Sequence, residues 1–152
     1  LVIEAFIELY KRGSKAQITF YGGTEERLEE LRNRYDLPPT IHFKGIVDEV
    51  PYRLHQCYLS ASYTELFANA CVEALNQGLL ALLSDVEIAH RFYADKSDAI
   101  RLFRNKGQLI QMIEEMEQAD YGQSNAENIA LASHYSLGTV TQGYRELLDR
   151  NL

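Results

Sequence analysis

Basic residues are scarce in this 152-residue sequence, in which 15 Lys and Arg stand against 22 Asp and Glu and give a formal net charge of -7 at pH 7. Proteins whose main partner is nucleic acid or an anionic membrane surface need basic patches. The ten tyrosines are scattered and form no stacking platform for single-stranded nucleic acid. Both classes of main partner are therefore disfavoured, although backbone N–H groups at a helix N-terminus can still bind a phosphate locally.

Cysteine is also rare, and Cys57 and Cys71 both lie in apolar runs. This pattern favours buried free thiols over a disulfide or a metal pair, and it fits a reducing cytoplasm. The four histidines show no metal-ligand spacing, so we expect structural roles for them; they are His42, His55, His90 and His134. His90 follows a predicted strand near the candidate site described below. We therefore expect no metal.

Long apolar runs are missing, because none approaches the roughly 18 residues that a membrane span needs. We also find no signal-peptide pattern, internal repeat, linker or low-complexity tract in the sequence. With 46% apolar and 24% charged residues, the chain can bury a substantial core and is expected to form one globular domain.

What the sequence does contain is an alternation of strand and helix patterns. Strands are predicted at 16–21, 41–44, 57–61, 79–84 and 100–103, and helices at 2–12, 25–35, 50–56, 68–77, 87–93, 106–117, 126–132 and 137–148. The order predicts an α/β fold with a single doubly wound parallel sheet of about five strands flanked by helices. Because such a domain normally opens on a strand and this chain opens in a helix, we expect it to be part of a longer protein.

The segment between the third and fourth predicted strands, SYTELFANACVEALNQG at 62–78, holds the strongest candidate site. Glu65 lies in its polar part and Glu73 follows eight positions later on the predicted helix. Ligands of parallel α/β folds collect where strands run out into helix N-termini. In an acidic chain, however, two glutamates at this spacing arise easily by chance, and taken alone they favour a solvated loop and a solvated helix face.

Several segments in a fixed order resemble one family. They are ITFYGG at 18–23, IHFKGIVDEVPYRLHQC at 41–57, the 62–78 segment, LLALLSD at 79–85 and SNAENIALASHYSLGTVTQGYRELL at 124–148. Together they are similar to the retaining, nucleotide-sugar-dependent glycosyltransferases of the group 1 type, which have the GT-B fold of two Rossmann-like halves. The resemblance is to the C-terminal, donor-binding half and covers nearly the whole chain.

The resemblance implies that residues 1–152 form a nucleotide-sugar binding domain that lacks its own first strand and the N-terminal acceptor domain. The full-length enzyme would be a cytoplasmic, hexosyl-type transferase of polysaccharide biosynthesis that moves a sugar from a donor such as a UDP- or GDP-sugar with retention. The acceptor, a glycan, lipid or protein, would bind through the missing domain. Peripheral membrane association of the full-length enzyme is compatible with this family. The isolated chain is expected to be inactive and to bind nucleotide weakly.

The resemblance also assigns roles to site residues. Glu73 would accept hydrogen bonds from the ribose hydroxyls, and Glu65, the catalytic candidate, would orient the donor sugar. The backbone N–H groups at the helix start would face the diphosphate or the sugar, where the helix dipole favours negative charge; they belong to Phe67, Ala68 and Asn69. Stabilising the leaving diphosphate in this way implies no metal cofactor.

Two further candidates are open between a functional and a structural interpretation. Gly22, with Gly23, follows the first strand of the pattern and either admits a ligand or makes a plain turn. Ile46, with Val47, follows the second strand. This is where the backbone of the family contacts the base, but the two residues are otherwise interpreted as hydrophobic filler.

The sequence departs from the family pattern at Leu66 and Ala68, where the family usually has glycines, and at Leu79, which replaces a common proline. Glycine at such places admits positive φ or the close approach of a ligand. These departures motivate an alternative, a catalytically degenerate glycosyltransferase-like module for binding or scaffolding. A third possibility, a flavodoxin-like regulatory domain, would need an acidic cluster after the first strand, and none is found there.

Overall fold

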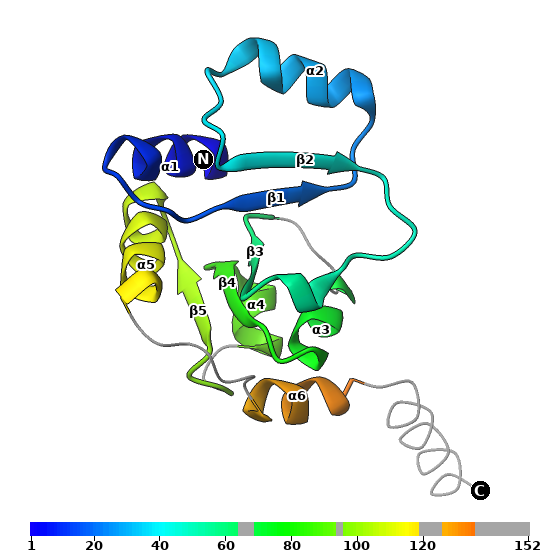
Figure 1. The fold of residues 1–152 in the computed structure, drawn as a ribbon. Helices are drawn as coiled ribbons and strands as arrows, with labels where there is room; N and C mark the ends of the chain where they lie inside the picture. Colours follow the sequence, from blue (N-terminus) through cyan, green and yellow to red (C-terminus); the bar gives the residue numbers. More distant parts are fainter. Residues whose placement is uncertain (64–68, 94–95, 119–125, 136–152) are drawn as a thin grey trace, which may run out of the picture. The chain divides into compact units, whose positions relative to one another are not determined.

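The structure, a computed structural model, describes residues 1–63, 69–93, 96–118 and 126–135 (Figure 1). Its elements follow the chain as α1 (Val2–Lys11), β1 (Ile18–Tyr21), α2 (Glu25–Arg34), β2 (Ile41–Gly45), the 3-10 turn η1 (Tyr52–Leu54), β3 (Cys57–Ser60), α3 (Asn69–Asn76), β4 (Leu80–Ser84), α4 (Glu87–Phe92), β5 (Ile100–Phe103), α5 (Lys106–Gln118) and α6 (Ala126–Ser133). The α/β class is confirmed. The helix expected at 137–148 lies outside the described residues.

The five described strands form two hydrogen-bonded groups, where we expected a single sheet. β1 pairs with β2 in parallel, and β3, β4 and β5 form a second group in which β3 and β4 are parallel. The chain likewise divides into two compact units, unit 1 with Leu1–Pro51 and Phe103–Tyr121, and unit 2 with Tyr52–Leu102 and Gly122–Leu152. Local patterns predict strands, but they do not say which strands share hydrogen bonds.

In unit 1, α1 lies along α5 (Figure 1). Phe6 and Leu9 are buried on α1, as the 3.6-residue period of its apolar positions predicts. At the surface, Arg12 donates to Glu8 at 2.6 Å and to Glu114 of α5 at 3.1 Å. Gly13 ends α1 with φ of 87°, a conformation that glycine adopts without strain, which confirms the predicted stop.

The capped helix predicted after β1 is also confirmed. Thr24 precedes α2 in an extended conformation, and its hydroxyl accepts a hydrogen bond from the backbone N–H of Arg27 at 3.4 Å. Leu28 is buried on this helix, and α2 contacts β2 within the same unit. The local sequence therefore fixes both the start and the inner face of α2.

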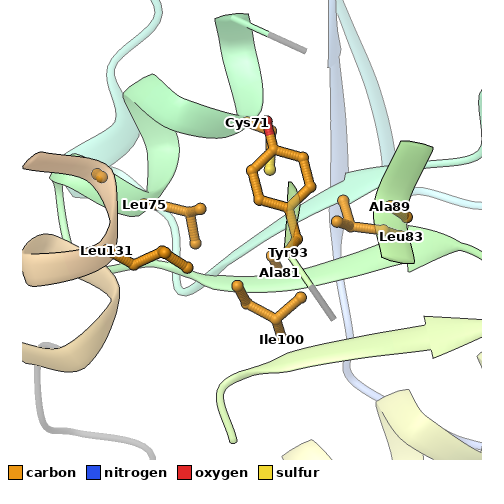
Figure 2. Packing of buried hydrophobic residues seen from close by; sticks show 9 residues of the cluster. Cys71, Leu75, Ala81, Leu83, Ala89, Tyr93, Ile100 and Leu131 are labelled. Atoms are coloured by element: carbon orange, nitrogen blue, oxygen red, sulfur yellow. The ribbon is translucent and has the colours of Figure 1, made fainter. Parts of the chain in front are cut away.

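In unit 2, β4 is the most deeply buried strand, with all five residues buried. A continuous apolar run of this kind is typical of a central strand covered on both faces. α3 and α4 contribute to the core, in which the Tyr93 ring lies beside Cys71 (Figure 2). The cluster comprises Cys71, Leu75, Ala81, Leu83, Ala89, Tyr93, Ile100, Leu131 and Ala132.

A buried polar bridge ties α6 to the start of β4. The side-chain amide of Asn128, which is fully buried, donates to the carbonyl oxygen of Leu79 at 2.6 Å and accepts from the hydroxyl of Ser97 at 2.6 Å. The Ser97 hydroxyl in turn accepts from the backbone N–H of Ala99 at 3.2 Å. A buried amide is tolerated when its polar atoms find partners, so this bridge fixes α6 against its own strand group.

Both thiols are free, as predicted, but only Cys71 is buried and Cys57 is half-buried. Burial raises the pKa of the Cys57 thiol to about 12. Across the described part of the chain, no helix has the length and apolar character needed to cross a membrane.

Candidate functional site

Glu73, the predicted ribose ligand, lies on the exposed side of α3, directly before the buried Ala74 and Leu75. Its position follows from the helical period, because the inward positions of α3 pack into the core of unit 2 and the intervening positions face solvent. The structure thus presents a carboxylate on the helix that follows β3. This is the placement that the sequence predicts.

The Glu73 carboxylate has a partner that the sequence does not reveal. The hydroxyl of Tyr52 donates to Oε2 of Glu73 at 3.0 Å and also lies 3.4 Å from the carbonyl oxygen of Ala70. Tyr52 opens η1, the short turn before β3, where a longer helix was expected at 50–56. Beside it, Nε of Arg53 donates to Oε1 of Gln77, one helical turn after Glu73.

Asn69 is the first residue of α3, one turn before Glu73, and it is exposed. The structure therefore places these two predicted site residues on one helix. Glu65, Phe67 and Ala68 lie outside the described residues, so their predicted roles stay predictions.

In unit 1, the structure brings Gly22 and Ile46 to the same end of the β1–β2 pair. The backbone N–H of Gly22 donates to the carbonyl oxygen of Gly45 at 2.6 Å, so the turns after the two parallel strands meet. The side chain of Ile46 is 80% exposed, which argues against the interpretation as core filler. Whether either residue contacts a base or a diphosphate stays a prediction.

The glycine requirement at Gly22 comes from its backbone rather than from crowding. Its φ is 86°, and a Cβ added there would meet nothing within 4 Å. We expect Gly22→Ala to lower the free energy of unfolding by about 1 to 2 kcal/mol, because an L-residue is strained at this φ. Urea unfolding followed by circular dichroism would measure the loss.

The matched control for this glycine is Gly22→Asn, because asparagine tolerates left-handed φ better than alanine does. We expect Asn to cost less than Ala at this position. Equal stability of Gly22→Ala and the wild type would contradict the assignment of a strained backbone.

His90, in α4, is paired with a carboxylate, since its Nε2 contacts Oδ1 of Asp85, the residue that follows β4. Asp85 is largely buried, with a side chain 12% exposed, and His90 is more open. Within the part of the chain that the structure describes, no three potential ligands gather into a metal site. The pair therefore gives His90 a local structural partner.

Comparison with known proteins adds the decisive observation, because residues 1–129 match the family described as glycosyl transferases group 1. The chain belongs to this family. Among curated proteins, none matches the sequence. The family assignment rests on a match that covers most of the chain, and it includes both strand groups and the α3 segment.

Solved structures agree with the family in fold. The structure of a GtfA/B complex is similar with a TM-score of 0.81 at 19% identity, over 98% of this chain and 32% of that one. The pneumococcal O-GlcNAc transferase GtfA, solved with UDP and GlcNAc, gives 0.73 at 18% identity, over 98% and 32%. Sucrose-phosphate synthase from Thermosynechococcus elongatus gives 0.73 at 19% identity, over 97% and 42%.

These likenesses show the fold, which is that of GT-B glycosyltransferases. The chain spans about a third to two fifths of the length of these structures.

Sequence reasoning missed Tyr52, and no local signal points to it. The contact of this tyrosine with Glu73 spans 21 positions of the chain. A contact at such a separation depends on how η1 packs on α3, which no periodicity encodes.

Proposed function

We propose that this chain binds the donor in an enzyme that transfers a hexosyl-type sugar from a nucleoside diphosphate to an acceptor with retention of configuration. The observation that carries the proposal is the exposed Glu73 carboxylate on α3, held by the Tyr52 hydroxyl at 3.0 Å, in a chain of the group 1 family. The solved neighbour that contains UDP and GlcNAc supports a nucleotide-sugar donor.

In this proposal, Glu73 accepts hydrogen bonds from the vicinal hydroxyls of the ribose. A carboxylate suits this task because it offers only acceptors, and hydrogen bonds to a charged acceptor are stronger than neutral ones. Asn69 contributes the backbone N–H at the start of the described helix, together with the preceding N–H groups of Phe67 and Ala68. For Gly22 and Ile46, at the ends of β1 and β2 in unit 1, we propose nucleotide contacts from the family resemblance alone.

The proposed chemistry is stabilisation of a leaving group. As the glycosyl bond breaks, negative charge grows on the diphosphate and the sugar becomes oxocarbenium-like. Backbone donors fixed at the helix start interact more strongly with that growing charge than with the ground state, which lowers the barrier. Glu65 orients the sugar hydroxyls, and no metal is needed for these steps. The acceptor is a glycan, a lipid or a protein, and the rest of the enzyme binds it. The enzyme works in the cytoplasm. It associates peripherally with the membrane if its acceptor is a lipid.

A titration of the chain with UDP, GDP and their sugars tests donor binding. We expect amide shifts in the nuclear magnetic resonance spectrum at Asn69 and Glu73 and at Gly22, with inorganic pyrophosphate as the control for binding through phosphate alone. If none of these nucleotides at millimolar concentration shifts the resonances of α3, the proposal is wrong for this chain.

The departures at Leu66 and Ala68 favour one other function, a degenerate module that binds without catalysis. Experiments on the full-length protein distinguish the two functions. Transfer activity that disappears on Glu65→Ala while the protein stays folded supports catalysis. A full-length protein that binds a nucleotide sugar but transfers nothing to any acceptor supports the binding module.

A further inference from the structure

The Glu73 carboxylate is held by a side-chain hydrogen bond although it is exposed. A surface glutamate samples many rotamers, and fixing it costs conformational entropy. Here the hydroxyl of Tyr52 donates to Oε2 at 3.0 Å. No other described residue forms a hydrogen bond with this carboxylate, so Tyr52 is its anchor within the part of the chain that the structure describes.

The anchor itself is fixed in place. The backbone N–H of His55 donates to the carbonyl oxygen of Tyr52 at 2.9 Å, which closes the η1 turn. Arg53 in the same turn donates from Nε to Oε1 of Gln77 at 3.2 Å. Because Glu73 and Gln77 are four positions apart, both bonds reach the same face of α3. The turn is therefore attached to this helix at two points.

The Tyr52 hydroxyl also keeps its proton under ordinary conditions. Burial of the half-buried ring, followed by the hydrogen bond to Glu73 and the negative charge of that carboxylate, raises the pKa of Tyr52 well above the usual tyrosine range. A protonated phenol is a donor, and a carboxylate is an acceptor only, so the direction of this hydrogen bond is settled.

We propose that Tyr52 is a positioning residue that orders the Glu73 carboxylate before the ribose of a nucleoside diphosphate arrives; this inference rests on the proposed function of Glu73. Each carboxylate oxygen has two lone pairs, so Oε2 can accept from the phenol while the group still accepts from two vicinal ribose hydroxyls. With the side chain already ordered, binding loses less rotamer freedom. Tyr52 thereby sharpens the selectivity of the site for a complete ribose.

The test compares UDP with 2′,3′-dideoxy-UDP, which lacks both hydroxyls, by calorimetry on the wild type and on Tyr52→Phe. We expect Tyr52→Phe to bind UDP about threefold to tenfold more weakly, the range set by the ordering of one flexible side chain. Its affinity for 2′,3′-dideoxy-UDP should stay unchanged. If GDP and not UDP binds the wild type, the same comparison uses GDP and its dideoxy form.

Two controls separate positioning from general loosening of the turn. Arg53→Ala removes the other bond between η1 and α3 without touching the carboxylate, and it should keep the full preference for the ribose hydroxyls. Adding Tyr52→Phe to Glu73→Ala should change neither affinity, because the phenol acts through the carboxylate. Thermal unfolding of each variant checks folding. Tyr52→Met, which also lacks the donor, replaces Tyr52→Phe if that variant does not fold.

The outcomes distinguish this inference from the proposed function. If the wild type and Tyr52→Phe prefer UDP over 2′,3′-dideoxy-UDP by the same factor, Tyr52 does not position the carboxylate. The proposed donor site would still stand in that case. If Tyr52→Phe binds UDP and 2′,3′-dideoxy-UDP more weakly by the same factor, Tyr52 has a structural role only, and the positioning role is overturned. A wild type with no preference would refute ribose binding by Glu73 itself, and the inference would fall with it.

Discussion

Glu73→Ala is expected to weaken UDP binding by about 10-fold to 100-fold, which is the range for losing hydrogen bonds to a charged group. The reason is that the carboxylate would bind the ribose hydroxyls, and alanine offers no acceptor in its place. Glu73 is exposed on α3, so the substitution removes no core contact and should leave the fold intact. Calorimetry or nuclear magnetic resonance titration of both proteins measures the change.

The matched control for this substitution is Glu29→Ala on α2, which removes the same charge from another exposed helical glutamate. We expect that control to bind UDP as the wild type does, so that a general electrostatic effect of net charge can be separated from a local one. Glu73→Gln should fall between the two, because the amide keeps one acceptor oxygen but loses the charge. Unchanged UDP affinity in Glu73→Ala would refute the ribose assignment.

Asn128→Ala is expected to lower the free energy of unfolding by about 2 to 5 kcal/mol, since two buried polar groups lose their partner at about 1 to 3 kcal/mol each. The groups are the carbonyl oxygen of Leu79 and the hydroxyl of Ser97, which Asn128 bridges at 2.6 Å each. A domain of this kind is stable by only about 5 to 15 kcal/mol, so the loss is a large share of the total. Urea unfolding measures it.

Two further variants serve as controls for Asn128→Ala. Asn76→Ala replaces an exposed asparagine near the end of α3 and should change stability by less than about 0.5 kcal/mol. Ser97→Ala leaves the bond from Asn128 to Leu79 intact and should cost less than Asn128→Ala. If Asn128→Ala unfolds at the same urea concentration as the wild type, the buried bridge contributes nothing to stability.

The secondary structure was predictable because its signals are local. The helical period of apolar residues placed α5 within one residue of its observed end, and Thr24 marked the start of α2 through its cap. Pro51 marked a first helical turn, but the helix expected over 50–56 is only the three-residue η1. The division of five strands into two hydrogen-bonded groups depends on contacts between distant segments and was beyond local patterns.

The candidate site was predictable only where the chain itself carries the information. Glu73 could be placed on an exposed helical face from the spacing of its apolar neighbours. Tyr52 could not be assigned, because its role exists only once η1 packs on α3. Asn128 is a similar case, since a polar residue in a helix pattern normally faces solvent and its buried partner Leu79 lies 49 positions away.

That separation has a consequence for how the protein is made. A ribosome adds residues from the N-terminus, so Leu79 and the apolar strand β4 are synthesised 49 residues before Asn128. At about 5 to 20 residues per second, Leu79, the residue before β4, waits roughly 2 to 10 seconds for the helix residue that bonds its carbonyl oxygen. Until then the apolar residues of β4, the most deeply buried of the described strands, lack the cover that α6 contributes and are prone to aggregate.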